Sequence, residues 1–440
     1  MSYQHKILAV LGLGYIGLPL SATLANVGFN IIGVDIDKNK IENLKKMKLP
    51  FYEPGLAGTL EECKDKIEYT TNSSDALKRA DGIFVTVGTP VDENNLPNYT
   101  AINAVVQEIG QNLRTGQVII FKSTLVLGTT EHLIKPKLEE LSGLKAGKDF
   151  YLVFCPERTI EGQVLHELYS LPKIIGGINE ESSRQAEAII KKLGGKTTIV
   201  SSPAVAEMCK LIDNMYRAIN IGFANEIGQL CEKIGIDADN VVNAVNNSYS
   251  RTHIFKPGLG ADGPCLSKDP YLFKYSAEKL GVKTPMVDGC ISQSHFSTLR
   301  VADFVKEYIE KNNKESYKIA LVGLAFKGFP ETDDLRGSPA LKIMNSINSM
   351  GKNVKYVCYD PLVKEFQGLE INKYIDHNIT DCDVVLFLTN HPRLMHVILN
   401  DKLKNGQLIV DCWGNVHDYQ QIEARSGIKY YRIGRADQNI

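Results

Sequence analysis

One cysteine stands in a sequence context that differs from that of all the others. Cys265 ends the glycine- and proline-rich run 257–264, and Lys268 and Asp269 follow it within four residues. Backbone without bulky side chains can lie against a ligand, and a nearby ammonium group favours the thiolate, the nucleophilic form of cysteine. From composition alone, a catalytic and a non-catalytic role for this thiol remain equally open.

Polar residues recur at helical spacing in the middle of the chain. Lys210 and Asn214 are four residues apart, so they lie on one face of the helix that the surrounding apolar period predicts. Glu207 and Arg217 extend the same polar stripe. A solvated helix surface is the simpler interpretation of this stripe, and a functional site is the alternative.

Two further candidates follow predicted strands. Glu157 comes just after the apolar run 151–154, at the carboxyl end of a strand, where sites of α/β sheets form. A surface glutamate is the alternative interpretation. Lys327 follows the run 318–322 and precedes Thr332–Arg336. Lysine and arginine at such a sheet edge could hold phosphates, and a salt bridge within the turn is equally compatible with the sequence.

A glycine motif lies between the first predicted strand and the first predicted helix. Gly12 permits a tight turn, Gly14 lets the backbone approach a pyrophosphate, and Gly17 packs the helix on the strand. The phosphates would rest on the helix N-terminus. Asp35 ends the second strand, where it could accept from a ribose 2′-hydroxyl and would repel a 2′-phosphate. The motif therefore predicts NAD rather than NADP, with a glycine turn of an unrelated α/β protein as the alternative.

Alternating strands and helices must position these residues. Apolar or β-branched runs separated by helical periods indicate crossover connections and parallel sheets, so we predict two doubly wound, Rossmann-like α/β domains. The predicted strands are Lys6–Leu11, Asn30–Val34, Gly82–Val87, Val118–Lys122, Tyr151–Phe154, Lys318–Val322, Val354–Tyr359, Asp383–Leu388 and Gln407–Asp411. The two ends of the chain also echo each other: residues 81–85 match 383–387 in pattern, and residues 116–120 match 406–410.

A long helix is predicted to lie between these two domains. Ser202 and Pro203 are typical of a helix start, and the apolar period continues to Ile234 before Gly235. That is roughly 32 residues, or about 48 Å. Two shorter helices with a kink are the alternative. We predict an N-terminal domain over residues 1–200, a central helical domain over 201–312 and a C-terminal α/β domain over 313–440.

Composition excludes several classes of protein. The 440 residues, 43% hydrophobic and 23% charged, suggest about three globular domains. With 50 basic and 51 acidic residues, the sequence lacks the excess of basic residues that is typical of a nucleic-acid binder. It has no apolar run of about 20 residues, so we expect no membrane span. A polar start without a secretory signal, and nine cysteines without a C-x-x-C pair, predict a cytoplasmic protein without disulfides or a metal site.

Five motifs, together with the cysteine loop, resemble the UDP-glucose/GDP-mannose dehydrogenase family over nearly the whole chain. They occur in the order of the family at residues 12–20, 88–90, 122–124, 207–214 and 323–340. The resemblance implies an N-terminal NAD domain, a dimerising helical centre and a C-terminal domain that binds the nucleotide of a UDP-sugar. Such enzymes oxidise C6 of the sugar twice, from alcohol to carboxylate, with two NAD.

The resemblance also implies a role for each candidate residue. Cys265 is the nucleophile that forms a thiohemiacetal and then a thioester, Lys210 and Asn214 hold the oxygen on C6, and Asp269 positions water. Glu157 is the base of hydrolysis, and Thr124 helps to order the attacking water. Implied cofactor contacts are Gly12, Gly14, Tyr15, Ile16, Gly17, Asp35, Lys40, Thr89, Thr124, Lys268 and Arg336. Implied substrate contacts are Glu157, Arg158, Thr159, Glu161, Lys210, Asn214, Arg217, Arg251, Phe255, Gly258 and Lys327, with Arg251 reaching the substrate of a second subunit in a homodimer.

The cysteine loop departs from the family pattern. Asp262 and Gly263 stand where two glycines are usual. Aspartate tolerates a positive φ better than most residues, but we expect Asp262 to bring a negative charge near the Cys265 thiolate. Pro264 makes the residue before the nucleophile rigid.

The sequence motifs indicate the identity of the sugar substrate less clearly than they indicate the reaction. Residues 156–162, 164–168 and 173–177 resemble the branch of UDP-N-acetylmannosamine dehydrogenases, with UDP-N-acetylglucosamine or UDP-glucose as alternative substrates. An NAD-binding scaffold without activity is a rival of a different class, although Cys265 and Lys210 are both present. A 6-phosphogluconate-like dehydrogenase is a rival enzyme, which the C-terminal α/β domain disfavours.

Overall fold

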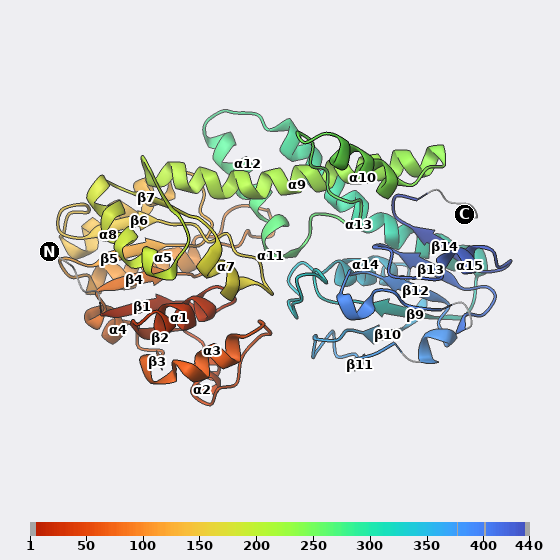
Figure 1. The fold of residues 1–440 in the computed structure, drawn as a ribbon, viewed down its shortest axis with the longest axis horizontal. Helices are drawn as coiled ribbons and strands as arrows, with labels where there is room; N and C mark the ends of the chain where they lie inside the picture. Colours follow the sequence, from red (N-terminus) through yellow and green to blue (C-terminus); the bar gives the residue numbers. More distant parts are fainter. Residues whose placement is uncertain (1–5, 376, 400–401, 436–440) are drawn as a thin grey trace. The chain divides into compact units, whose positions relative to one another are not determined.

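The computed structural model describes residues 6–375, 377–399 and 402–435, which form two compact units (Figure 1). The first unit comprises the described residues up to Asp213 together with Tyr271–Lys283. The second comprises Asn214–Pro270 and the described residues from Thr284 onward. The predicted central domain is thus divided between the two units, and its existence as a separate domain stays a prediction.

The first unit is built on one eight-stranded sheet with the order β3-β2-β1-β4-β5-β6-β7-β8. Neighbouring strands are parallel except β6 and β7, which are antiparallel. The strands are β1 (Ile7–Leu11), β2 (Asn30–Val34), β3 (Ile67–Thr70), β4 (Gly82–Val85), β5 (Val118–Phe121), β6 (Tyr151–Phe154), β7 (Lys173–Gly177) and β8 (Thr197–Val200). The order reverses between β1 and β4, the position at which doubly wound sheets bind ligands.

Helices bury both faces of this sheet. Along β1, Leu8 and Val10 pack into one apolar cluster, whereas Ala9 and Leu11 pack into another. This alternation explains why the strand is apolar at every position. The helices of this unit are α1 (Gly17–Asn26), α2 (Lys38–Lys45), α3 (Leu56–Glu62), α4 (Ser73–Arg79), α5 (Thr100–Asn112), α6 (Lys135–Ser142), α7 (Val164–Ser170) and α8 (Glu180–Ile190).

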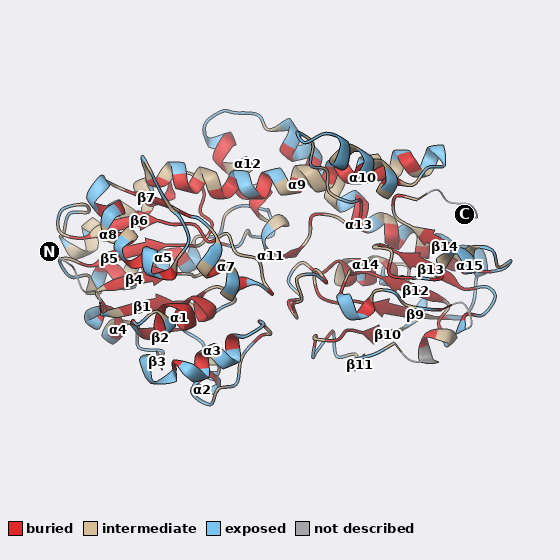
Figure 2. Cartoon of the chain, viewed as in Figure 1, coloured by how far each residue is buried: buried red, intermediate tan, exposed pale blue. Residues whose placement is uncertain are grey.

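The second unit repeats this architecture with a six-stranded parallel sheet, drawn mainly in blue in Figure 1. Its order is β11-β10-β9-β12-β13-β14, and its central strands β9, β12 and β13 are buried on both faces (Figure 2). The strands are β9 (Ser316–Val322), β10 (Asn353–Tyr359), β11 (Ile371–Asn372), β12 (Val384–Phe387), β13 (Leu408–Asp411) and β14 (Lys429–Arg432). The helices are α10 (Ala238–Ser248), α11 (Gly263–Leu266), α13 (Pro285–Asn312), α14 (Pro339–Asn348) and α15 (Tyr419–Glu423).

Two helices belong to both units. α9 spans Pro203–Ile234 and crosses the boundary after Asp213, and α12 spans Asp269–Lys279 and crosses it after Pro270. The start and the end of α9 agree with the prediction, so the alternative of two shorter helices is wrong.

The sequence echo between the two ends of the chain extends to hydrogen bonds. Asp81 accepts from the amide of Ile7 at 3.1 Å, and Asp383 accepts from the amide of Lys318 at 2.8 Å. Asp81 comes just before β4, and Asp383 comes just before β12. Each aspartate therefore links its strand to the neighbouring central strand of the sheet, β1 or β9. Corresponding bonds join Leu13 to Asp35 and Leu324 to Asp360.

All nine predicted strands are present, with ends that differ by no more than two residues. The sequence analysis missed β3, β7, β8, β11 and β14. β3 and β8 are sheet-edge strands with half-exposed threonines, and β11 has two residues. Such strands lack the continuous apolar run that marks a buried parallel strand. Within the described ranges, no helix is long and apolar enough to cross a membrane, and no group of three or more acidic, histidine or cysteine side chains could hold a metal ion.

Candidate active site

The glycine turn of the first unit has the geometry that a dinucleotide needs. Gly12 adopts φ +94°, and a Cβ on Gly17 would lie 1.8 Å from the carbonyl oxygen of Gly12, so both positions exclude other residues. A Cβ on Gly14 would meet nothing within 4 Å. The backbone at Gly14 is therefore open to a bound group, and the turn fits the predicted pyrophosphate.

Asp35 holds this turn as well as facing the predicted ribose position. Its carboxylate accepts from the amide of Leu13 at 2.9 Å and from Lys40 Nζ at 2.7 Å. Burial opposes ionisation, but the bond from Lys40 and two backbone amides outweigh it and lower the pKa of Asp35 below its ordinary value. Asp35 is thus a charged acceptor beside the glycine turn, as an NAD site requires.

The other predicted cofactor contacts of this unit surround the same sheet edge. Tyr15 stacks on Phe51 with ring centroids 4.1 Å apart. Thr89 is buried, and its hydroxyl donates to the backbone oxygen of Thr124, which joins the two motifs that carry these residues. Ile16 is half-buried beside Tyr15 in the chain.

A buried charge cluster lies at the carboxyl ends of the neighbouring strands β5 and β6. Lys122 Nζ lies 3.2 Å from Glu157 Oε2 and 3.9 Å from Cys155 Sγ. Glu157 is only 7% exposed, so the interpretation as a surface glutamate is wrong. Its other oxygen, Oε1, accepts from the amides of Arg158 and Thr159 at 2.8 and 3.1 Å.

This cluster fixes the charge of Glu157. Burial would raise the pKa of Glu157, but the positive charges of Lys122 and Lys173 and the two amide donors outweigh burial and lower the pKa to about 2. Glu157 is therefore an ionised but weakly basic carboxylate. Lys122 is buried at 2% exposure and was not singled out by the sequence analysis, although its place at the end of a strand next to β6 was a usable signal.

The residues that follow Glu157 lie in the segment between β6 and α7. The Arg158 guanidinium donates to the carbonyl oxygen of Pro172 and lies 3.5 Å from Asp213. Thr159 and Glu161 are half-buried. The structure therefore places these predicted substrate contacts in one segment at the carboxyl end of β6.

The polar stripe of α9 is buried. Glu207 is 0% exposed, Lys210 is 7% exposed and Asn214 is 0% exposed, so the interpretation as a solvated face is wrong. Glu207 accepts from the amides of Gly128 and Thr130 and from the Thr130 hydroxyl, at 2.6, 2.9 and 2.6 Å. Burial raises the pKa of Glu207 to about 7 despite these donors. Glu207 thus fastens the turn after the Thr124 motif to the helix that carries Lys210.

In the second unit, Asn214 and Asp269 form a buried pair. The Asn214 amide donates to Asp269, which also pairs with Lys268 Nζ, and Arg217 donates to the Asn214 side-chain oxygen. Both Asn214 and Asp269 are 0% exposed. This network orients the Asn214 side chain and links it to the residues that follow Cys265. Lys268, predicted as a cofactor contact, is here the partner of Asp269.

Cys265 lies on the short helix α11 and is exposed. All nine cysteines lie in the described part of the chain, and none of them forms a disulfide. Seven of the other eight are buried, and Cys209 is half-buried.

The backbone of the cysteine loop requires no positive φ at Asp262. Asp262 has φ −96°, and the positive φ of +85° falls on Gly263 instead. A Cβ on Gly263 would lie 2.3 Å from the ring of Phe326, so glycine is required there on two grounds. The carboxylate of Asp262 pairs with Lys342 and is not an uncompensated charge.

Three more predicted substrate contacts lie at the loop that leads to Cys265. The amide of Phe255 donates to Asn220 of α9 at 2.8 Å, and the amide of Gly258 donates to Asn225 of the same helix at 2.8 Å. Arg251 is exposed and lies over the ring of Tyr249. α9 therefore fixes this loop through the backbone of Phe255 and Gly258.

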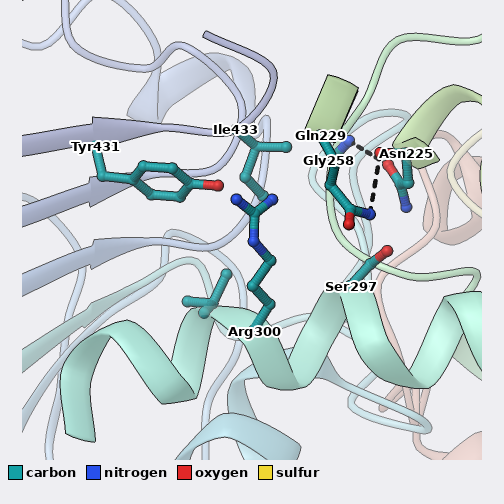
Figure 3. A pocket seen from close by; sticks show the side chains of 8 residues that line it. Asn225, Gln229, Gly258, Ser297, Arg300, Tyr431 and Ile433 are labelled. Atoms are coloured by element: carbon teal, nitrogen blue, oxygen red, sulfur yellow. Dashed lines mark hydrogen bonds between the residues drawn. The ribbon is translucent and has the colours of Figure 1, made fainter. Parts of the chain in front are cut away.

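A small pocket opens beside Gly258 (Figure 3). Its lining includes Gln229, Arg300 and Tyr431, and Asn225 bonds to both Gly258 and Gln229. Apart from Gly258, no residue predicted to act on the substrate lines it. The pocket therefore belongs to the packing of α9, α13 and β14.

Lys327 and Arg336 lie in the segment between β9 and α14. Arg336 forms a salt bridge with Asp334 at 2.6 Å, so a salt bridge within the turn is present, as one interpretation of the sequence expected. Lys327 Nζ lies 5.7 Å from the ring centre of Phe326. The same Phe326 ring packs against Gly263, so this segment adjoins the cysteine loop.

Comparison with known proteins identifies the class to which this arrangement belongs. Residues 6–194, 204–293 and 320–418 match, in turn, the NAD binding domain, the central domain and the UDP binding domain of the UDP-glucose/GDP-mannose dehydrogenase family. The chain belongs to this family. It is accordingly an NAD-dependent nucleotide-sugar dehydrogenase, an oxidoreductase.

Individual relatives cover the whole chain. A UDP-N-acetyl-D-mannosamine dehydrogenase from Pyrococcus horikoshii is 31% identical, with 98% of this chain and 99% of the relative covered. The UDP-glucose 6-dehydrogenase TuaD from Bacillus subtilis is 30% identical, with 98% and 93% covered. A solved structure of UDP-D-ManNAc dehydrogenase from Pyrococcus horikoshii superposes with a TM-score of 0.87 at 30% identity, covering 98% of this chain and 100% of that one.

Proposed function

We propose that the protein oxidises C6 of a UDP-N-acetylhexosamine, with UDP-N-acetylmannosamine as the best candidate, to the uronate with two NAD. The observation that carries the proposal is Cys265, an exposed thiol in a chain whose other cysteines are buried or half-buried. In the same unit, Lys268 and Asp269 follow this thiol in the chain, and Asp269 pairs with both Lys268 and the buried Asn214. A four-electron oxidation that passes through a thioester needs such a nucleophile, and a simple alcohol dehydrogenase does not.

The residues of the first unit fit the cofactor. The open backbone at Gly14 would receive the pyrophosphate, and the ionised Asp35 would accept from the adenosine ribose. Lys40 and Tyr15 would complete this half of the site. When bound, NAD supplies the hydride acceptor for each of the two oxidations.

The remaining chemistry is assigned to side chains of the chain. The Lys210 ammonium and the Asn214 amide would hold the oxygen on C6 as it loses its proton, which stabilises developing negative charge. The Cys265 thiolate would add to the aldehyde, and the second oxidation of that thiohemiacetal would leave a thioester on sulfur. Water would then cleave the carbon–sulfur bond, giving the carboxylate and restoring the thiol.

The low pKa of Glu157 bears on its predicted role in hydrolysis. A carboxylate whose pKa is about 2 accepts a proton poorly at neutral pH. For Glu157 to act as the base, its bond to Lys122 must weaken when the substrate is bound. With that ion pair intact, Glu157 would orient water together with Thr124, and another group would have to accept the proton of the attacking water.

Two copies of the chain are proposed to pair through α9. Tyr216, Phe223 and Leu230 are spaced by seven residues on this helix and are 55%, 52% and 66% exposed. On α13, Phe296 is 50% exposed. An apolar stripe at this period favours a twofold helix pair. Arg251, which is exposed, would then reach the substrate of the partner subunit.

The test counts NADH released per sugar consumed, across UDP-N-acetylmannosamine, UDP-N-acetylglucosamine and UDP-glucose. We expect two NADH per sugar, with the largest kcat/KM for UDP-N-acetylmannosamine. One NADH per sugar would contradict the thioester route, and no NADH with any sugar would favour a scaffold. A larger kcat/KM for UDP-glucose would move the assignment to the UDP-glucose 6-dehydrogenases, of which TuaD is a relative.

A further inference from the structure

The carboxylate of Asp262 is the centre of a polar contact that fastens the cysteine loop to the rest of its unit. One oxygen pairs with Lys342 Nζ, on α14. The other accepts from the Thr298 hydroxyl, on α13, at 2.8 Å. The Asp262 side chain is 4% exposed and Thr298 is 1% exposed, so this contact is shielded from water.

The surrounding backbone leaves this loop little freedom to move. The Thr298 hydroxyl also accepts from the amide of Gly260 at 3.1 Å. A Cβ on Gly260 would lie 2.2 Å from the carbonyl oxygen of Ser294, and Gly263 donates its amide to Gly337. The loop is thus in van der Waals contact with α13 and with the segment between β9 and α14.

Asp262 immediately precedes the helix α11 that carries Cys265. Through residues 262 and 263, the position of the thiol depends on α13, α14 and the Phe326 ring. A carboxylate three residues from a thiolate would disfavour the thiolate if its charge were not balanced. Lys342 balances that charge in this structure.

We propose that Asp262, paired with Lys342, is a positioning residue for Cys265: the pair fixes the turn that presents the thiol, and Lys342 balances the charge of the carboxylate three residues before the thiol. The proposal depends on the assignment of Cys265 as the nucleophile. It concerns a pair of side chains that takes no part in binding or in the chemical steps themselves. Its consequence is that removal of either partner changes the reactivity of Cys265, in opposite directions.

The test compares Asp262→Asn, Lys342→Met and the double variant in the full-length protein. The readout is the rate of alkylation of Cys265 by iodoacetamide at pH 7, followed by peptide mass spectrometry. Lys342→Met leaves an unbalanced carboxylate and should slow alkylation by about threefold, the size of effect expected when one unit charge near a thiolate in a partly hydrated site loses its partner. Asp262→Asn leaves an unbalanced ammonium and should speed alkylation by a similar factor, and the double variant should return to near the wild-type rate.

Loss of structure alone would give a different pattern. Loosening of the loop would speed alkylation in both single variants, and that result, or rates equal to the wild type in both, would overturn the proposal. Thr298→Val, which keeps the ion pair, should preserve the order of rates among the charge variants. Lys364→Met, at an exposed position of the same unit, is the matched control and should leave the rate unchanged.

Steady-state kinetics of the same variants provide a second, independent test of the positioning role. Both single variants should lower kcat with little change in KM for the UDP-sugar and for NAD, because neither side chain is assigned to binding. If kcat/KM falls in both single variants only because KM rises, that result would contradict a positioning role. If no sugar yields NADH, the proposed function fails, but the alkylation rates still decide the role of Asp262.

Discussion

Glu157→Gln removes the negative charge from the buried cluster at the ends of β5 and β6. The pKa of this carboxyl falls from an ordinary value of 4.5 to about 2, and each unit is worth about 1.4 kcal/mol, so the ionised group contributes about 3 kcal/mol to folding at neutral pH. The substitution should cost a comparable amount. Part of that cost comes from Lys122, which would remain buried and charged without its carboxylate.

The sign of the pH dependence follows from the lowered pKa. A carboxyl that is more acidic in the folded state contributes fully above about pH 4.5, and its contribution is lost as the pH falls toward 2. The wild-type protein should therefore lose stability more steeply between pH 5 and 2 than Glu157→Gln does. The assay is hydrogen exchange of peptides that contain β5 and β6, measured at several pH values, since exchange there reports on this sheet alone.

Two variants make the result specific. Glu68→Gln removes a carboxylate from an exposed pair with Arg79 and should cost no more than about 0.5 kcal/mol. Combining Glu157→Gln with Lys122→Met should cost less than Glu157→Gln alone, because no buried charge is left unpaired. Unchanged exchange in Glu157→Gln, or an acid dependence identical to the wild type, would refute the reasoning about the cluster. In the same variant, mass spectrometry after incubation with NAD and substrate should detect a thioester adduct on Cys265, as expected if Glu157 serves hydrolysis.

Four more outcomes are expected. Cys265→Ser should reduce formation of the acid by roughly 10³-fold or more, measured as NADH per sugar, and wild-type turnover would reject the nucleophile. Asp35→Ala should weaken NAD binding by about tenfold and improve the relative binding of NADP, measured by calorimetry. Because burial raises the pKa of Glu207 to about 7, the stability that this acid contributes should be greatest below pH 4.5 and fall as the pH rises through 7, and Glu207→Gln should flatten that slope in thermal unfolding. Phe223→Asp with Leu230→Asp should lower both dimer content in sedimentation and activity, and a fully active monomer would exclude the shared site.

The elements that could be predicted from the sequence are those with a strong local signal. Pro203 and the apolar period that follows it gave both ends of α9, and the central strands β1, β2 and β6 were recognisable as buried apolar runs. β3 and β14 could not be recognised, because an edge strand is stabilised by its neighbour more than by its own hydrophobicity.

The sequence predicted where the candidate site residues lie along the chain, but not which of their side chains pair with each other. Glu157 was expected at a strand end, yet its bond to Lys122 depends on β5 and β6 being neighbours, which no short window of sequence contains. The sequence pattern did not indicate which residue of the cysteine loop takes a positive φ. The chain places it on Gly263, which is the position that also faces Phe326.

The ion pair with Lys122 explains how the buried Glu157 carboxylate can remain charged. Glu157 pairs with Lys122 and Asp269 with Lys268, each within its own unit. Because these partners are already in place, the carboxylates need no reorganisation of solvent when a ligand arrives, which is the condition for electrostatic preorganisation. Glu207 differs, since it accepts hydrogen bonds from three neutral groups of Gly128 and Thr130, and burial raises its pKa to about 7. Near neutral pH, the hydrogen bonds that Glu207 accepts from the turn after Thr124 should therefore respond to its protonation.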